Sequence, residues 1–301
     1  MTELQKEIIR LKQEKNALVL AHYYQTLDIQ EVADIVGDSF ELAKRAQTTD
    51  KDLIVLCGVR FMAESAKILN PGKKVLLPAS DAGCLMGDML DPAGVVKMKE
   101  EHPDAAVMCY VNSTAETKTY CDICCTSSSA VKIARSLPNQ EIIFVPDRNL
   151  GGYVAEQVPE KTFYFYRGFC PIHNVVRLEE VEAARKEHPG ALVLVHPECA
   201  KDVRDAADYI GSTAGIIRFV EESPLKEFII GTEIGVVERI NKYVVGKTAY
   251  LLSHHLRCSN MKKTTISDVH HALLHEQEEI ILEESLMDRA RLTLERMVAV
   301  K

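Results

Sequence analysis

Short apolar segments alternate with amphipathic segments along most of the chain. Continuous apolar runs, each about as long as one β-strand, occupy residues 17–24, 105–112 and 191–198, and each follows a charged helical segment. The first of these helices is predicted over residues 1–15, MTELQKEIIRLKQEK. Continuous apolar strands between amphipathic helices are typical of parallel sheets that are covered by helices on both faces.

The same order of elements recurs three times along the chain. Each first strand is followed by a helix, a small polar triplet, a second strand, a helix and a third strand that runs into a cysteine. The triplets are GDS (37–39), CTS (125–127) and GST (211–213). Each unit is therefore predicted as helix–strand–helix–strand–helix–strand, with three strands.

The three units share one register. Three sets of landmark residues recur at spacings of 86 or 88 residues. They are the first-strand ends His22, Tyr110 and His196, the triplet hydroxyls Ser39, Ser127 and Thr213, and the third-strand cysteines Cys84, Cys170 and Cys258. Apolar strands resemble one another by chance, but three coincident sets indicate an internal repeat.

We predict an α/β fold of three similar three-layer α/β/α units, with parallel sheets arranged around a pseudo-threefold axis. The expected units are 1–90, 91–177 and 178–262, with C-terminal helices in 263–301 returning to cover the first unit. In parallel sheets the carboxyl ends of the strands carry the ligand site. If these edges face the axis, the three cysteines meet at one point.

Composition limits the classes of function. The formal net charge of −8 and the lack of a basic stripe argue against a nucleic-acid partner. No apolar run approaches the roughly 20 residues needed to cross a bilayer, so no membrane association is expected. The first 15 residues lack the apolar core of a secretory signal, and a cytoplasmic location is predicted.

The nine cysteines point to free thiols or metal ligands rather than to disulfides, since their number is odd. Three converging thiolates without a fourth ligand suit a [4Fe–4S] cluster with one open iron, which could act as a Lewis acid. Structural zinc would need a fourth ligand, which a nearby histidine could supply. The alternative is three small buried hydrophobes, a reading that the shared register disfavours.

Other candidate motifs carry less weight. CDICC holds Cys121, Cys124 and Cys125, but no second CxxC completes a zinc site, so we interpret them as incidental, with a redox role as the alternative. The pair His271 and His275 is interpreted as a solvated helix face. His254 and His255 either line the pocket or cap the strand. No GxGxxG or GxxxxGK[ST] motif indicates a nucleotide.

Taken together, the motifs resemble the quinolinate synthase (NadA) family from about residue 15 to 275. They are AHYYQ, GDS, YVNSTAE, CTSS, PDRNLG, HPEC, GST, GTEIG and CSNMKK. The resemblance implies a transferase of NAD biosynthesis that condenses iminosuccinate with dihydroxyacetone phosphate to quinolinate, phosphate and water. It also implies one [4Fe–4S] cluster per chain and an upstream supplier, L-aspartate oxidase or aspartate dehydrogenase.

The resemblance also assigns residues. Cys84, Cys170 and Cys258 match cluster ligands, and Tyr24 and Glu198 match groups that move protons. Substrate contacts match His22, Ser39, Tyr110, Val111, Asn112, Ser127, His196, Pro197, Glu198 and Thr213.

Residue chemistry is compatible with these roles. Hydroxyls at helix starts can grip carboxylates or phosphate, and His22 and His196 are expected to titrate near neutrality and to give charge-assisted hydrogen bonds. Val111 and Pro197 are expected to supply only wall or backbone contacts. The competing functions are an iron–sulfur electron carrier or redox sensor and a zinc-stapled binding scaffold.

Overall fold

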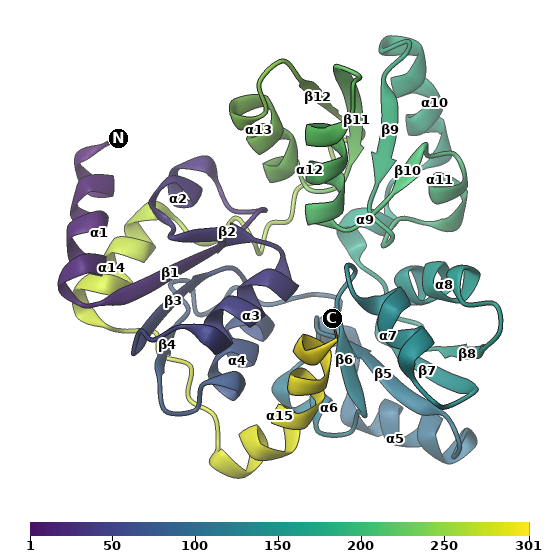
Figure 1. The fold of residues 1–301 in the computed structure, drawn as a ribbon, viewed down its shortest axis with the longest axis horizontal. Coiled ribbons are helices and arrows are strands. Elements are labelled where there is room, and N and C mark those ends of the chain that lie inside the picture. The colour runs from purple at the N-terminus through teal and green to yellow at the C-terminus, as the bar shows by residue number, and fades with distance from the viewer. Residues whose placement is uncertain (301) are drawn as a thin grey trace.

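The computed structural model describes residues 1–300 and contains three sheets of four parallel strands each. Figure 1 shows these sheets and their helices as three lobes around a common centre. All strand pairs within the sheets are parallel, and helices alternate with the strands along the chain. The predicted α/β fold of three similar units is confirmed.

Each unit repeats one order of elements. The first contains α1 (Glu3–Glu14), β1 (Ala17–His22), α2 (Leu27–Val32), β2 (Ile35–Gly37), α3 (Ser39–Thr48), β3 (Leu53–Cys57), α4 (Arg60–Leu69) and β4 (Lys74–Leu76), followed by the 3-10 turn Gly87–Met89. The second contains α5 (Pro92–Glu101), β5 (Ala106–Tyr110), α6 (Ala115–Lys118), β6 (Ile123–Cys125), α7 (Ala130–Ser136), β7 (Glu141–Val145), α8 (Arg148–Gln157), β8 (Thr162–Phe165) and α9 (Pro171–Asn174). The third contains α10 (Leu178–Glu187), β9 (Leu192–Val195), α11 (Lys201–Asp205), β10 (Tyr209–Ile210), α12 (Thr213–Glu222), β11 (Glu227–Gly231), α13 (Ile234–Tyr243) and β12 (Thr248–Leu251).

The sheets have four strands rather than the three expected. Their orders are β2-β1-β3-β4, β6-β5-β7-β8 and β10-β9-β11-β12, which are equivalent. The additional strands β2, β6 and β10 lie at a sheet edge and contain only two or three residues each. Such short segments are too brief for a periodic pattern, so the sequence did not reveal them. Each runs into, or directly precedes, a polar triplet.

Burial of both sheet faces explains the continuous apolar strands. Every residue of β1 is buried. Leu18 and Leu20 pack into one hydrophobic cluster, whereas Val19 and Ala21 pack into another on the opposite face. Successive strand side chains point to opposite faces, so a strand between two helical layers needs apolar residues at every position.

The C-terminal helices α14 (Ile266–His275) and α15 (Glu284–Ala299) occupy different places. Helix α14 packs beside α1, α2 and β3 of the first unit. Helix α15 contacts α3 and α4 of the first unit and also α6 and β6 of the second, and Figure 1 shows it between these two lobes. The C-terminal segment therefore covers two units rather than the first alone, because buried residues such as Met287, Leu294 and Met297 join a cluster that both units share.

The third unit contains two further hydrophobic clusters, and Tyr23 and Tyr24 of the first unit pack against one of them. It meets the first unit where the start of α13 approaches the loop after β1. A Cβ atom at Gly235 would lie 2.7 Å from the Tyr23 carbonyl oxygen and 3.1 Å from the Tyr24 Cα. Glycine is therefore required here by the close approach of two backbones. No helix within residues 1–300 combines the length and apolar character needed to cross a bilayer.

We expect Gly235→Ala to lower the free energy of unfolding by about 1–3 kcal/mol, because the added methyl group meets backbone atoms that cannot rotate away. Urea unfolding measures this change. Gly72→Ala is the matched control, since no atom lies within 4 Å of its added Cβ, and it should change stability by no more than about 0.5 kcal/mol. Equal stability of the two variants would contradict the close contact.

Candidate active site

The carboxyl ends of the strands of all three units border one cavity of about 80 Å³. The first-strand landmarks His22, Tyr110 and His196 line it, each at or directly after the end of a strand. In each sheet these strands lie at the point where the strand order reverses, which is where open α/β sheets bind ligands.

The three repeated cysteines line this same cavity. The sequence predicted that these cysteines end the last strand of each unit. Instead, Cys84, Cys170 and Cys258 lie in the loops that follow β4, β8 and β12. All three are half-buried, whereas the other six cysteines are buried. Exposure thus separates the repeated set from the rest.

Backbone N–H groups act on each of these thiols from its own loop. The N–H groups of Gly87, His173 and Met261, three residues beyond the cysteine in each loop, lower the pKa of Cys84, Cys170 and Cys258. Removal from bulk water outweighs this effect and raises the pKa of all three thiols, that of Cys84 to about 12. Without metal the sulfurs are therefore protonated, with donors already placed to stabilise thiolates.

Two buried acidic side chains bind the loops of Cys170 and Cys258. Asp147 and Glu233 are both 0% exposed and cap the helices α8 and α13 through backbone N–H groups. Asp147 Oδ2 also accepts the Cys170 N–H at 3.1 Å, and Glu233 Oε1 accepts the Cys258 N–H at 3.3 Å. Each carboxylate thus ties a helix start to a cysteine loop. The first unit has Val59 at this position, without a side-chain cap.

Two of the three histidines that line the cavity, His22 and His196, adopt the same tautomer. His22 Nδ1 accepts the Tyr24 N–H at 3.1 Å, and His196 Nδ1 accepts the Glu198 N–H at 3.3 Å. A neutral ring with an accepting Nδ1 carries its proton on Nε2. His196 Nε2 lies 3.2 Å from Ser127 Oγ and can donate to it.

Burial keeps both imidazoles neutral. It lowers the pKa of His22 to about 3, with further lowering by Lys262 and His196. Burial also lowers the pKa of His196 to about 3, although the nearby Glu198 carboxylate raises it. The expectation that these residues titrate near neutrality is therefore wrong, because the sequence does not show their burial. They offer neutral N–H donors rather than charge-assisted bonds.

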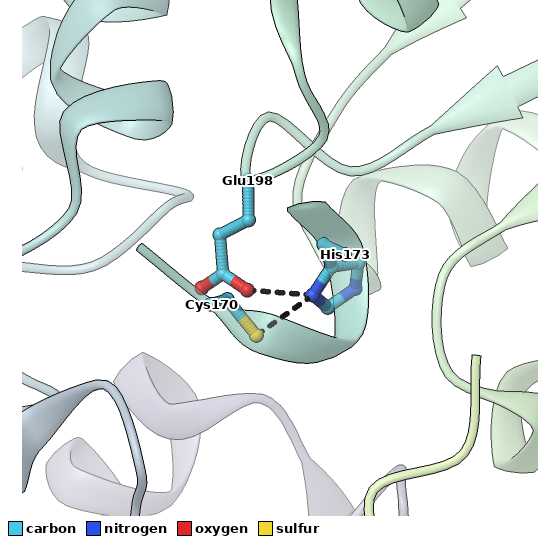
Figure 2. Close-up of side chains that lie close together, drawn as sticks. All are labelled: Cys170, His173 and Glu198. Carbon is cyan, nitrogen blue, oxygen red and sulfur yellow. Dashed lines mark hydrogen bonds and ion pairs between the residues drawn. The ribbon is translucent and has the colours of Figure 1, made fainter. Parts of the chain in front are cut away.

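Glu198 is the ionised group of the cavity. Its Oε1 accepts a hydrogen bond from Tyr110 Oη at 2.7 Å, and its Oε2 lies 2.7 Å from His173 Nδ1. Burial raises the pKa of Glu198, but His196 and His173, with the two hydrogen bonds, together hold it below its ordinary value. Figure 2 shows His173 Nδ1 facing both the Glu198 carboxylate and the Cys170 sulfur, which is 3.3 Å away.

Tyr24 is held by two threonines. Its hydroxyl lies 3.0 Å from Thr213 Oγ1 and 2.8 Å from Thr232 Oγ1. Desolvation and the Glu198 carboxylate raise the pKa of Tyr24 well above its ordinary value, so it remains a proton donor.

The triplet hydroxyls also line the cavity. Ser39 and Thr213 are the first residues of α3 and α12, whereas Ser127 lies in the turn before α7. The first-turn N–H groups of these two helices already bind the capping side chains of Asp38 and Ser212. Fewer donors than expected are therefore available to bind an anion at these helix starts, namely the hydroxyls and the N–H groups that remain.

Of the remaining predicted substrate contacts, Asn112 lines the cavity, whereas Val111 and Pro197 do not. Asn112 lines the cavity, and its buried Oδ1 has no hydrogen-bond partner within residues 1–300. Val111 is buried in the core instead, and Pro197 lines a neighbouring cavity. Neither side chain borders the main cavity, so the expected wall contacts are not seen, and their backbone contacts to substrate stay a prediction.

Comparison with known proteins identifies the family. The family description "Quinolinate synthetase A protein" (NadA) matches residues 6–299. The chain belongs to this family. A quinolinate synthase of Alkaliphilus metalliredigens is 53% identical, over 100% of this chain and 99% of that protein. Those of Clostridioides difficile and Methanoregula boonei are each 49% identical, over 96% and 99% of this chain and 95% and 98% of theirs. The resemblance seen in the motifs is confirmed, and the chain is an enzyme.

The other candidate motifs lie outside the cavity that Cys84, Cys170 and Cys258 line. Cys121, Cys124 and Cys125 are buried in the core around β6. His271 and His275 are exposed on α14. His254 and His255 do not line the cavity but lie exposed beside Glu180, with their ring centroids 3.8 Å apart.

Three side chains that organise the cavity, His173, Asp147 and Glu233, were not predicted from the sequence. The repeat contained a signal for two of them, because Asp147 and Glu233 are 86 residues apart and Val59 precedes Asp147 by 88. His173 carried no comparable signal, since Gly87 and Met261 occupy its place in the other units.

We expect the free energy of unfolding of the metal-free, reduced chain to fall as the pH falls from about 6.5 toward 3, partly through His22. In this window the unfolded chain binds one more proton at this residue than the folded chain does. The slope contributed is about 1.4 kcal/mol per pH unit. His22→Asn keeps an acceptor for the Tyr24 N–H, and urea unfolding should show a slope shallower by that amount. The exposed control His271→Asn should keep the wild-type slope.

We also expect N-ethylmaleimide to label Cys84, Cys170 and Cys258 of the metal-free chain before the six buried cysteines. The reason is access, since the pKa values of all three thiols are raised by desolvation. Time-resolved peptide mass spectrometry measures the order. Labelling of Cys121 or Cys124 first would contradict this assignment.

Proposed function

We propose that the protein is a quinolinate synthase of NAD biosynthesis, which condenses iminosuccinate with dihydroxyacetone phosphate to quinolinate, phosphate and water. The observation that carries the proposal is the convergence of Cys84, Cys170 and Cys258 from three units on one cavity that also holds histidines, hydroxyls and a carboxylate. Full-length similarity to quinolinate synthases supports the same reaction.

The donor set fits a [4Fe–4S] cluster. Three half-buried thiols border the cavity, and no fourth cysteine does so within residues 1–300. Backbone N–H groups of each loop favour the thiolate form of its cysteine, which is the form that ligates a cluster. Cys84, Cys170 and Cys258 would hold the cluster, one per chain. When bound, it supplies an iron that can act as a Lewis acid on substrate oxygen and assist dehydration.

Neutral donors would bind the two anionic substrates. The Nε2–H groups of His22 and His196, by their tautomers, and the hydroxyls of Ser39, Ser127 and Thr213 all border the cavity. The net charge of −8 provides no general attraction for anions, so their recognition must be local. The unpartnered Asn112 Oδ1 can accept from a substrate hydroxyl or imine N–H.

Proton transfers require one acid and one base. Glu198, ionised and held by Tyr110 and His173, can accept a proton. Tyr24, with its pKa raised, stays protonated and can donate a proton, and Thr213 and Thr232 hold its hydroxyl in place. The two groups thus occupy opposite protonation states in one cavity, as acid–base catalysis requires.

We expect the anaerobically prepared protein to carry about four irons and four sulfides per chain and to form quinolinate from the two substrates. Cys84→Ala should lose both the cluster and the activity, because the cavity offers no replacement sulfur. Cys121→Ala is the matched control and should keep both, since this cysteine lies in the core. Iron and sulfide analysis and product chromatography measure the outcome.

Three results would contradict the proposal. Protein that binds zinc but assembles no cluster even when it starts zinc-free would favour the binding scaffold. A cluster-replete protein that forms no quinolinate would favour the electron carrier or redox sensor. Loss of the cluster in Cys121→Ala would show that Cys121 is needed to hold it, contrary to the assignment of Cys84, Cys170 and Cys258.

A further inference from the structure

One of the three cysteines belongs to a second group of possible metal ligands. Cys170 Sγ, His173 Nδ1 and a Glu198 carboxylate oxygen all lie within 4.8 Å of one another, as Figure 2 shows. His173 and Glu198 are only 2% and 4% exposed. Cys84 and Cys258 are not members of this group.

The group contains one sulfur, one nitrogen and one oxygen. Zinc accepts all three ligand types and commonly takes three protein ligands and one water. Around a tetrahedral zinc ion such ligand atoms lie roughly 3.4–3.6 Å apart, given bond lengths of about 2.0–2.3 Å. The observed separations from His173 Nδ1 are 3.3 Å to Cys170 Sγ and 2.7 Å to Glu198 Oε2, so small side-chain shifts would admit the ion.

A second set of contacts already orients these ligands. His173 Nε2 lies 3.0 Å from Thr232 Oγ1, which leaves Nδ1 free to coordinate once Nε2 carries the proton. Glu198 Oε1 is fixed by the Tyr110 hydroxyl, so Oε2 is the oxygen that faces the group. Metal-binding imidazoles and carboxylates are generally held by outer partners of this kind.

We propose that Cys170, His173 and Glu198 bind one zinc ion in the protein before its iron–sulfur cluster is assembled. The thiol proton of Cys170 leaves to solvent when the sulfur coordinates. Because this sulfur cannot ligate zinc and the cluster at once, zinc and cluster exclude each other; this second statement rests on the proposed function. Zinc also binds such sites more tightly than ferrous iron does, so it competes effectively when both are present.

The binding test titrates zinc into the metal-free, reduced full-length chain against a chromophoric chelator. One tight site is expected. His173→Gln should weaken it by more than about 100-fold, since losing a ligand costs more than the 10–100-fold typical of an outer partner. Thr232→Val, which removes only the outer partner of His173, should weaken it by about 10–100-fold.

His255→Gln provides the matched control, because His255 belongs to the exposed group with Glu180 and His254. It should leave the tight site unchanged. Cobalt in place of zinc should give a sulfur-to-cobalt absorption band that His255→Gln keeps and Cys170→Ser loses. Wild-type affinity in His173→Gln, or loss of the tight site in His255→Gln, would overturn the proposal.

The exclusion test adds iron and sulfide to chains with and without bound zinc. Zinc-loaded wild type should assemble at least about 10-fold less cluster than zinc-free wild type, whereas His173→Gln should assemble it equally well in both conditions. Full assembly with zinc still bound would overturn the exclusion. If zinc-free wild type assembles no cluster, the proposed function fails while the titration still decides whether the zinc site exists.

Discussion

The structure depends on bringing three sulfurs from distant parts of the chain to one cavity. Each sulfur lies in a loop after the last strand of its unit, and the N–H group three residues further on lowers the pKa of each thiol. Parallel strands make this possible because their carboxyl ends lie on one side of each sheet. Because three such edges face one centre, residues of all three units line the cavity.

Exclusion of water determines how the other side chains of the cavity behave. Two imidazoles and two phenols are held neutral there, while Glu198 keeps its charge through hydrogen bonds and neighbouring imidazoles. Donors and acceptors fixed in such a place act more strongly than they would in water. An acidic chain can therefore offer anions a favourable site without a basic surface.

Much of the fold was predictable because it repeats. The common register of residues such as His22, Tyr110 and His196 indicated three units and one shared edge. The short strands β2, β6 and β10 were not predictable, since two or three residues carry no periodicity. The protonation states of the histidines were also missed, because burial arises from neighbours that are distant in sequence. His173 was missed for a related reason, since its partners Glu198 and Thr232 come from another unit.

The position of α15 has a mechanical consequence. By completing one hydrophobic cluster with the first two units, it joins them into a single body, whereas the third unit has two other clusters and meets the first unit through Tyr23 and Tyr24. The third unit is therefore the part of the chain that shares least of its core with the other two. That unit carries His196, Glu198 and Thr213, while Tyr24 and Tyr110 belong to the joined pair. Tyr24 and Glu198 therefore meet across this boundary, and the distance between them depends on how the third unit packs against the joined pair.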